Sequence, residues 1–281
     1  MAPPPPTRFQ VSAANAGESL QGFVRDQFGI SSRQAKDLLN RRSVIVNGRR
    51  VWMAKHKVQK GDTVEVVDAP SPPPARREPL TILYGDPWIL AVNKPPDRVS
   101  DRASDSVESC LREQENLPRL RALHRLDRPT SGVLLFNRDE SMREPYLDLF
   151  RGKRIEKMYE ALLAGQPADR ETAVRKPLDG KSAETTFTVI KRNGDFCRVE
   201  CRIATGRLHQ IRRHALAIGC RVAGDRHYGS QGGIHPLEKN LPRHMLHAAS
   251  VTFTCPHRNI PIHIFAPLPP DFTHARKQLG L

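Results

Sequence analysis

Asp127 has the surroundings of a reacting carboxylate. It lies in residues 124–132 (HRLDRPTSG), between Arg125 and Arg128, and an apolar segment at 133–136 that predicts a strand follows at once. Cations on both sides of a turn favour an ionised carboxylate, which suits a nucleophile or an electrostatic stabiliser better than a general acid. The alternative is that Asp127 only caps the turn and pairs with an arginine.

Three further stretches hold groups that could act beside this carboxylate. They are Lys157-Met-Tyr159, residues 204–214 (ATGRLHQIRRH) and residues 243–248 (RHMLHA). Together they supply a phenol, a glycine turn, cations, imidazoles and an apolar side chain. The candidates are Tyr159, Arg207, His209, Gln210, Arg212 and Leu246.

Metal chemistry is not predicted from this sequence. The histidines at 227, 235, 244, 247, 257 and 263 match no structural zinc spacing, and the chain has no HExxH motif. The five cysteines form no CxxC pair, and Cys197 and Cys201 alternate with charged residues as core residues of a half-buried strand do. We expect neither a metal nor another cofactor.

The charge balance predicts a polyanionic partner. The 281 residues include 45 Lys and Arg against 30 Asp and Glu, a formal net charge of +15, which favours nucleic acid. The longest apolar run, residues 88–92, is far too short to span a bilayer. The few scattered cysteines and an N-terminus without an apolar signal segment indicate the reducing cytoplasm.

Proline-rich stretches divide the chain into a small and a large domain. We expect a disordered arm over residues 1–17, a small domain over 18–68, a linker over 69–79 and a large domain over 80–281. In the small domain, apolar spacing predicts a helix from residue 20 to 28, and Ser31 with Gln34 predicts a capping box that begins a second helix. Short strands are predicted at 43–48, which ends in an Asn-Gly turn, and at 60–67.

A basic surface is predicted in the small domain. Between residues 31 and 60 there are nine Lys and Arg against one acidic residue, Asp37, which favours phosphate contact. The alternative is an ordinary solvated helix face. The candidate RNA-binding residues are Arg33, Lys36, Arg41, Arg42, Arg49 and Arg50.

The large domain is predicted to be α+β. Strands are expected at 80–84, 88–92, 132–136, 183–190 and 196–203, without a regular alternation of strand and helix. This pattern predicts a mixed, mostly antiparallel sheet, accompanied by a small α/β domain.

Both domains resemble known families. Ser32-Arg33, Val46-Asn47-Gly48 and Gly61-Asp62 make the small domain similar to the S-four-type RNA-binding domain, over about residues 18–67. Residues 80–265 resemble the RluA-type family of RNA pseudouridine synthases. Six motifs occur in that family's order: NKP at 93–95, HRLD…TSG, K-x-Y, TGR-x-HQIR, GD…YG at 224–229, and LHA.

The resemblance implies a role for each candidate. Asp127 would be the catalytic aspartate, Tyr159 would stack on the target base and assist proton removal, and Arg207 would pair with Asp127 and orient it. Arg125 would contact the RNA where the uridine leaves the stack, and Leu246 would pack near the base. His209, Gln210 and Arg212 would bind substrate or, alternatively, organise the turn in which they lie.

The implied activity is the isomerisation of specific uridines to pseudouridine in structured RNA, ribosomal or transfer, without a cofactor. The base must be flipped out of the stack. The carboxylate could attack the anomeric carbon, attack carbon 6 of the ring, or abstract a sugar proton. The alternative function is that of a non-catalytic RNA-binding or RNA-chaperone protein on the same fold. We expect a monomer that binds RNA and no membrane.

Three single residues and one four-residue stretch depart from the family's usual pattern. Pro129, Leu208 and Arg213 replace residues of other types, and residues 97–100 (DRVS) replace a more typical GLPV. None of the first three removes a group with a proposed chemical role, so they bear on how RNA docks.

Overall fold

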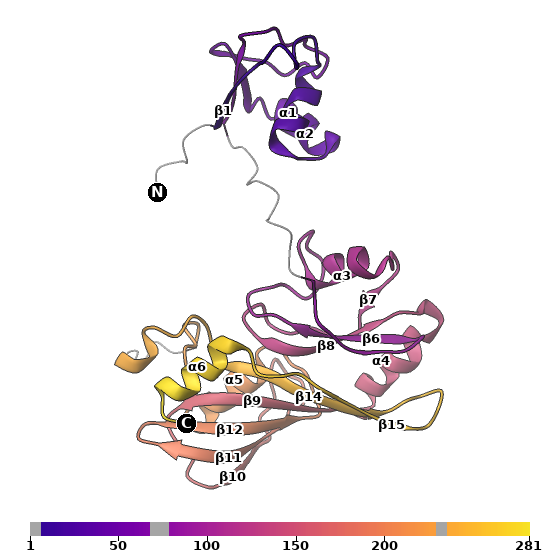
Figure 1. Ribbon diagram of the computed structural model, residues 1–281. Helices are drawn as coiled ribbons and strands as arrows, with labels where there is room; N and C mark the ends of the chain where they lie inside the picture. The colour runs from indigo at the N-terminus through magenta and orange to yellow at the C-terminus, as the bar shows by residue number, and fades with distance from the viewer. Residues whose placement is uncertain (1–6, 68–78, 229–234) are drawn as a thin grey trace. The chain divides into compact units, whose positions relative to one another are not determined.

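The computed structural model describes residues 7–67, 79–228 and 235–281 (Figure 1). Two compact units divide the chain, Met1–Glu78 and Pro79–Leu281, and the division falls at the proline-rich stretch. Residues 1–6 of the predicted arm, 69–78 of the predicted linker and Gly229 of the GD…YG motif lie outside the described residues.

The small unit is a four-stranded antiparallel sheet with two helices. The sheet order is β1-β4-β2-β3. Its elements are β1 (Thr7–Gln10), α1 (Leu20–Phe28), α2 (Ser32–Asn40), β2 (Val44–Val46), β3 (Arg49–Arg50) and β4 (Thr63–Val66). The predicted capping box is confirmed, because the Ser31 hydroxyl accepts from the Gln34 amide and the Gln34 side chain accepts from the Ser31 amide. Asn47 and Gly48 both have positive φ, as the predicted hairpin turn requires.

The prediction of a disordered arm is wrong for residues 7–17. β1 pairs with β4 in register from Thr7 opposite Val66 to Gln10 opposite Thr63. Val11 is buried, and its backbone exchanges hydrogen bonds with Asp62 and Gly61. The segment folds because a partner strand, 53 to 59 residues further on, satisfies its backbone groups, and no local pattern indicates such a partner.

The large unit is built on one sheet of eleven strands. Its main order is β10-β11-β12-β9-β14-β8-β6-β5, with β13 on β9, β15 on β14 and β7 on β8 (Figure 1). The strands are β5 (Ile82–Gly85), β6 (Ile89–Lys94), β7 (Arg121–Ala122), β8 (Ser131–Asn137), β9 (Glu156–Ala164), β10 (Glu171–Val174), β11 (Thr185–Asn193), β12 (Phe196–Ile203), β13 (Arg221–Val222), β14 (Leu246–Thr254) and β15 (Pro261–Phe265). The helices are α3 (Val107–Glu115), α4 (Arg143–Arg151), α5 (Gln210–Ala217) and α6 (Pro270–Gln278), with short 3-10 turns at Glu140–Met142 and Pro236–Glu238.

One parallel pair makes the sheet mixed. β14 runs parallel to β8 at His247 opposite Ser131 and Ala248 opposite Gly132, whereas the other strand pairs among the described residues, such as β14 with β9 and β6 with β8, are antiparallel. Gly132 has a φ of +118°, and a Cβ there would lie 2.1 Å from the Ala248 carbonyl oxygen. Only glycine therefore allows the two strands to approach at this point. The predicted mixed, mostly antiparallel α+β fold is confirmed.

Alternate strand residues face two separate cores. On β6, Leu90 and Val92 pack into one cluster with α3 and α5, while Ile89 and Ala91 pack into another with α4 and β15. Tyr159, Leu246 and Cys201 belong to the first cluster. The candidate side chains therefore lie on the α3–α5 face.

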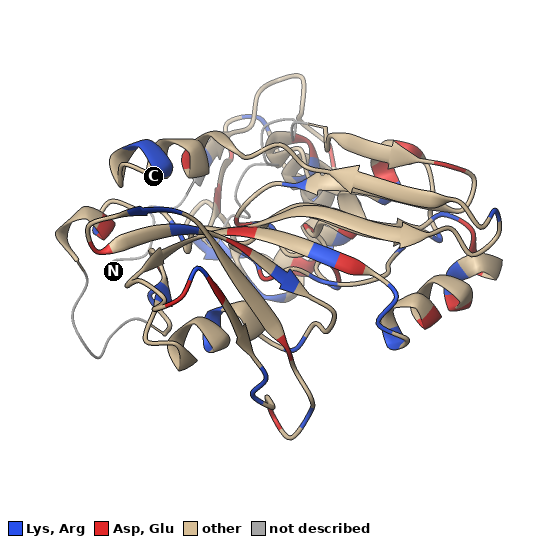
Figure 2. Cartoon of the chain, turned by 90° about the horizontal axis from the view of Figure 1, so that it is seen from below, with Lys and Arg blue, Asp and Glu red and all other residues tan. Residues whose placement is uncertain are grey.

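The charge of the chain is not gathered in one block. Figure 2 shows Lys and Arg interleaved with Asp and Glu along the strands and helices. Pairs such as Arg198 with Glu160, 2.8 Å apart, account for part of this pattern. Across the described residues, no helix combines the length and the apolar character needed to cross a membrane.

Candidate active site

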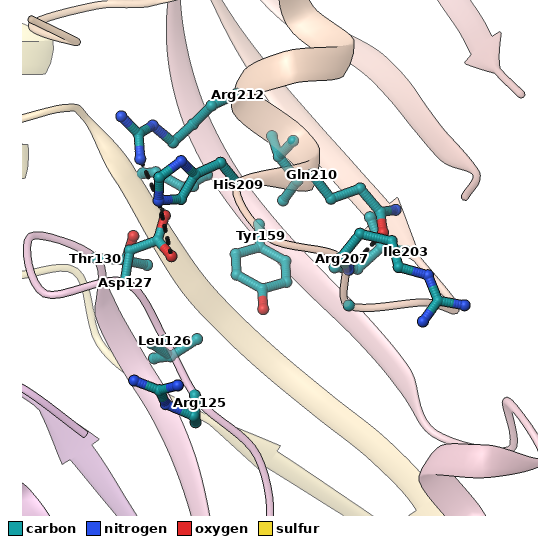
Figure 3. A pocket seen from close by; sticks show the side chains of 13 residues that line it. Arg125, Leu126, Asp127, Thr130, Tyr159, Ile203, Arg207, His209, Gln210 and Arg212 are labelled. Atoms are coloured by element: carbon teal, nitrogen blue, oxygen red, sulfur yellow. Dashed lines mark hydrogen bonds and ion pairs between the residues drawn. The ribbon is translucent and has the colours of Figure 1, made fainter. Parts of the chain in front are cut away.

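A pocket of about 440 Å³ brings most of the candidates together (Figure 3). Its lining comes from the loop before β8, the strands β9 and β14, and the segment that runs from the end of β12 into the start of α5. Its lining includes Arg125, Asp127, Tyr159, Arg207, His209, Gln210, Arg212 and Leu246. All eight large-unit residues named from the sequence thus line one cavity, although not all of them face its centre.

Buried cations fix the backbone of the loop that carries Asp127. The Lys94 ammonium donates to the carbonyl oxygens of Arg128 and Thr130, at 2.9 and 2.6 Å, and to its neighbour Pro95. On the other side of the loop, Arg243 donates to the Pro129 carbonyl at 2.9 Å. Three successive carbonyls are therefore held from two directions.

Lys94 comes from the NKP motif and is completely buried. Burial, together with the nearby charge of Arg243, lowers its pKa to about 7. The three carbonyl acceptors match the three protons of an ammonium group. The motif therefore acts through the loop and has no place in the pocket lining.

Neutral side chains complete the support of this loop. The Ser100 hydroxyl accepts from the Leu126 amide and donates to the Leu126 carbonyl, both at 3.0 Å. The Thr130 hydroxyl bonds to Nε2 of His244 at 2.8 Å. Burial lowers the pKa of His244 to about 3, so the imidazole is neutral at neutral pH.

Arg212 is the arginine that holds Asp127. Its Nη1 lies 3.2 Å from Oδ2 of Asp127, and its Nε and Nη2 bind both carboxylate oxygens of Asp225 at 2.6 and 2.8 Å. Burial alone would lower the pKa of Arg212, but the hydrogen bonds and charge of Asp225, aided by Asp127, raise it. A bidentate pair of this kind fixes the guanidinium in direction as well as in position.

The predicted pairing of Arg207 with Asp127 is wrong. The Arg207 Nε donates to the carbonyl of Ser182 at 3.1 Å, and Figure 3 shows its guanidinium on the far side of the Tyr159 ring from Asp127. Arg207 lies in the turn before α5, whereas Arg212 lies inside the helix, whose first turns face Asp127. The TGR motif therefore shapes the rim of the pocket.

His209 also approaches the carboxylate. Its Nε2 is 3.9 Å from Oδ1 of Asp127, and its Nδ1 bonds to the Tyr228 hydroxyl at 2.9 Å. Burial lowers the pKa of His209, although the charge of Asp127 opposes the shift. The residue has a φ of 53° where the chain enters α5, and this left-handed conformation directs the ring into the pocket.

The Gln210 side chain makes its hydrogen bonds within the turn before α5 and to the start of β11. Its Oε1 accepts from the Thr205 hydroxyl and the Arg207 amide, at 2.7 and 3.1 Å. Its Nε2 donates to the Glu184 carbonyl and to Thr185. Because both ends of the amide are engaged, these contacts match the alternative in which Gln210 organises the turn.

Tyr159 and Leu246 provide the apolar part of the pocket. They come from the adjacent strands β9 and β14, and the rest of both side chains packs into the core. Burial raises the pKa of Tyr159, and the charge of Asp127 adds to the rise, so the phenol keeps its proton at neutral pH. Figure 3 shows the ring in the middle of the pocket.

Arg125 stands at the mouth of the pocket. Its side chain is mostly exposed and its Nε lies 2.8 Å from Oδ1 of Asp101. It also lines a second, adjoining pocket of about 1010 Å³, together with Arg151, Lys153, Lys157 and Arg207. Burial and Arg207 lower the pKa of Lys157 to about 8.

Two supporting residues were not assigned a role from the sequence. Asp225 belongs to the GD…YG motif and Lys94 to the NKP motif, but neither motif indicates which groups these side chains contact. A buried acid is informative in so basic a chain, since it must be paired. The burial of Asp225 is visible only in the structure, where its cationic partner is Arg212.

The six basic candidates of the small unit are all exposed. Arg33, Lys36 and Arg41 lie on or at the end of α2, and Arg49 and Arg50 form β3. Arg41 pairs with Asp37 at 2.7 Å. Arg42 follows α2 and lies over the ring of Trp52. Among the residues described for both units, no group of three or more His, Cys, Asp or Glu is arranged to hold a metal.

Comparison with known proteins agrees with this fold. A family model described as RNA pseudouridylate synthase matches residues 89–217. Ribosomal large subunit pseudouridine synthase C of Vibrio cholerae is 30% identical, over 90% of this chain and 90% of that protein. An uncharacterized RNA pseudouridine synthase of Bacillus subtilis, YlyB, is 31% identical over 89% of each. The solved structure of human RNA pseudouridylate synthase domain containing 1 has a TM-score of 0.60 at 27% identity, covering 72% of this chain and 90% of that one.

Fold and sequence together define the class of protein as an isomerase that acts on uridine in RNA. The full-length relatives narrow the class: the chain belongs to the RluA-type family of RNA pseudouridine synthases.

Proposed function

We propose that this enzyme converts uridine to pseudouridine in ribosomal RNA of the large subunit, with Asp127 as the reacting carboxylate. The observation that carries the role of Asp127 is its contact with Arg212, which is itself fixed by Asp225. The substrate class rests on the relatives named as synthases of the ribosomal large subunit. Such a substrate is consistent with the cytoplasmic location predicted from the cysteines, and transfer RNA is the alternative substrate to test.

The reaction requires an enzyme group that stays in place and a uracil that turns. The bond between N1 of the uracil and C1′ of the ribose breaks, the uracil turns, and a bond forms between C5 and C1′. N1 gains a proton and C5 loses one, so no redox partner is needed. A carboxylate held by Arg212 supplies the fixed group in each of the three routes, and it could act on the sugar as in retaining glycosidases.

Two further residues would then act directly on the flipped base. Tyr159 offers a flat ring in the middle of the pocket, suited to stack on the uracil, and Leu246 closes the apolar side. Because burial keeps the Tyr159 phenol protonated, the hydroxyl can donate a hydrogen bond to the base or relay a proton from it.

The adjoining basic pocket would receive the RNA backbone on either side of the flipped nucleotide. Arg151, Lys153 and Arg207 lie there beside Arg125, and cations at these positions suit phosphates. Arg125 lines both pockets and so stands where the target nucleotide would leave the stack.

The small unit would add affinity for RNA. Its exposed cations on α2 and β3, and its sheet with two helices, fit the S-four-type domain that its sequence resembles. We propose that it binds RNA phosphates and that the enzyme acts as a monomer.

The test is release of tritium from RNA labelled at carbon 5 of uridine. Unmodified large-subunit ribosomal RNA and transfer RNA are each assayed as substrates of the wild-type enzyme and of the Asp127→Asn and Asp127→Ala variants. We expect release from ribosomal RNA that both variants abolish, while each still binds RNA within about tenfold of wild type, since Asp127 is no phosphate contact. Full release by Asp127→Ala would contradict the role of Asp127, and salt-sensitive binding without any release would favour a non-catalytic RNA-binding protein.

A further inference from the structure

Two large apolar side chains of the small unit are exposed next to each other. Trp52 is 54% exposed and Met53 is 60% exposed, in the segment between β3 and β4. Single exposed apolar residues are common on protein surfaces. An adjacent pair that includes an indole ring is a larger apolar area, and burying it against a partner is favourable.

The backbone keeps both side chains on the outside. On one side of the pair, the Val51 amide donates to the Val44 carbonyl at 3.0 Å; on the other, the Gln21 amide donates to the Ala54 carbonyl at 3.2 Å. The side chains of Val51 and Ala54 pack against the small unit's core. Trp52 therefore cannot turn inward without the loss of these backbone contacts.

The exposed ring lies among cations. The Arg42 guanidinium is 5.0 Å from the centre of the Trp52 ring, a cation–π arrangement. Arg42 has a φ of 57° directly after α2, and its amide bonds to Leu39. Arg50 precedes Trp52 by two residues, which in an extended chain places both on one side. Neither Arg42 nor Arg50 has an ion-pair partner among the described residues of this unit.

We propose that Trp52 is a stacking site for an unpaired base of the RNA substrate, with Arg42 and Arg50 binding the adjoining phosphates. The proposal rests on RNA being the substrate and adds a mode of recognition to it. Aromatic rings beside cations are the usual means of binding single-stranded nucleic acid, because every base offers a π face and every nucleotide a phosphate. A base inside a duplex has both faces covered, so the site would select an unpaired nucleotide.

Charge argues against a protein partner on this surface. The core of a protein interface is depleted of charged residues and needs a broad apolar area. Here the two apolar side chains follow closely after the exposed Arg49 and Arg50 of β3, and the exposed Arg42 lies over the Trp52 ring. The combination fits a polyanion with flat apolar groups.

The test uses the full-length protein and tryptophan fluorescence. The chain has two tryptophans, so Trp88→Phe leaves Trp52 as the only reporter. One RNA is a hairpin with an unpaired loop, and the other is a blunt duplex of equal length. We expect the hairpin to quench Trp52 fluorescence on binding and the duplex to leave it unchanged.

Affinity measurements separate stacking from charge. Trp52→Phe should bind the hairpin within about twofold of wild type, and Trp52→Leu about tenfold more weakly with an unchanged salt dependence. Both should bind the duplex as wild type does. Arg50→Gln should weaken the binding of both RNAs and reduce the slope of log affinity against log salt concentration by about one unit. Phe265→Leu is the matched control, because it removes a ring that is 59% exposed on the large unit and should leave both affinities unchanged.

Three results would overturn the proposal. They are equal hairpin affinity for Trp52→Leu and wild type, unchanged Trp52 fluorescence at saturating hairpin, and equal losses for hairpin and duplex. Binding is measured without turnover, so failure here is distinct from failure of the proposed reaction, which would appear as absent tritium release by wild type.

Discussion

Arg212 joins two carboxylates that are 98 positions apart in sequence order but adjacent in space. Its guanidinium binds Asp225 through two hydrogen bonds and Asp127 through one of 3.2 Å. Asp225 is itself held by the amides of His227 and Tyr228, at 3.0 and 3.2 Å. The orientation of Asp127 is thus set by a chain of contacts that begins in the loop after β13.

Loss of the Asp225 pair should slow the reaction more than it weakens RNA binding. Asp225→Asn removes one of the two carboxylates that hold Arg212, so the guanidinium can turn. We therefore expect the maximal rate of tritium release to fall about a hundredfold. Affinity for RNA should stay within about threefold, because neither residue is proposed to bind phosphate. Single-turnover assays at saturating RNA measure this rate.

The matched comparison for that prediction is between two arginines. Arg212→Lys loses the bidentate geometry and should reproduce the rate defect of Asp225→Asn. Arg207→Lys should lower the saturated rate less than fivefold, because Arg207 does not touch Asp127. If Arg207→Lys were the more damaging variant, the assignment of Arg212 as the orienting residue would be incorrect.

Tyr159 should show separate contributions of its ring and its hydroxyl. Tyr159→Phe keeps the flat surface, so RNA affinity should stay within about twofold while tritium release slows if the hydroxyl handles the proton. Tyr159→Leu removes the ring as well and should weaken both binding and release by at least tenfold. Equal affinity for the two variants would argue against stacking.

The buried ammonium of Lys94 should matter for stability. Lys94→Met leaves the carbonyls of residues 95, 128 and 130 without their donor, and we expect a loss of about 3 kcal/mol in the free energy of unfolding. Lys191→Met, at an exposed position, is the control and should change it by less than about 0.5 kcal/mol. Denaturant unfolding of the two variants, monitored by circular dichroism, gives the comparison.

Acid should destabilise the large unit through His244. Its pKa is about 3 when folded and about 6.5 when unfolded, so below pH 6.5 the unfolded chain takes up a proton that the folded chain does not. Stability therefore falls as the pH falls from about 6.5 toward 3, by about 2 kcal/mol at pH 5 from this residue. His244→Gln keeps a side-chain nitrogen that can hydrogen-bond to Thr130, and it should flatten the pH profile of thermal unfolding. An unchanged profile would show that other groups cause the loss of stability in acid.

A single methyl group at residue 132 should disrupt the sheet. Gly132→Ala places a Cβ against the Ala248 carbonyl, where β8 and β14 are paired, and we expect the large unit to lose several kcal/mol of stability. Gly180→Ala is matched for positive φ, at +71°, but meets no atom within 4 Å. A similar loss in both variants would show that backbone strain, rather than contact between the strands, is responsible.

Local patterns in the sequence predicted most of the elements but few of their partners. The capping box at Ser31, the strand over residues 196–203 and the Asn-Gly turn follow from neighbours within a few residues, and all three occur. β1 and the Arg212–Asp127 contact depend on segments 53 to 85 residues away. Nothing local to them indicates the partner, because tertiary packing decides which backbone or carboxylate is met.

The same limit applies to the candidate site. Motif order placed eight residues in one pocket, yet it could not distinguish Arg207 from Arg212, which are five residues apart across the start of a helix. The direction of each side chain depends on where the turn ends and α5 begins. The left-handed conformation of His209, which sets this point, is not visible in the composition of the turn.

The hydrogen-bonded carbonyls of residues 128–130 have a consequence for which groups move during the proposed reaction. In an enzyme with a mobile loop at this place, the carboxylate could move with the substrate between bond breaking and bond formation. Here Lys94 and Arg243 clamp that loop from both sides. In the proposed reaction the Asp127 carboxylate would therefore stay in place, and the uracil would turn beside it, leaving the sugar through N1 and rejoining it through C5.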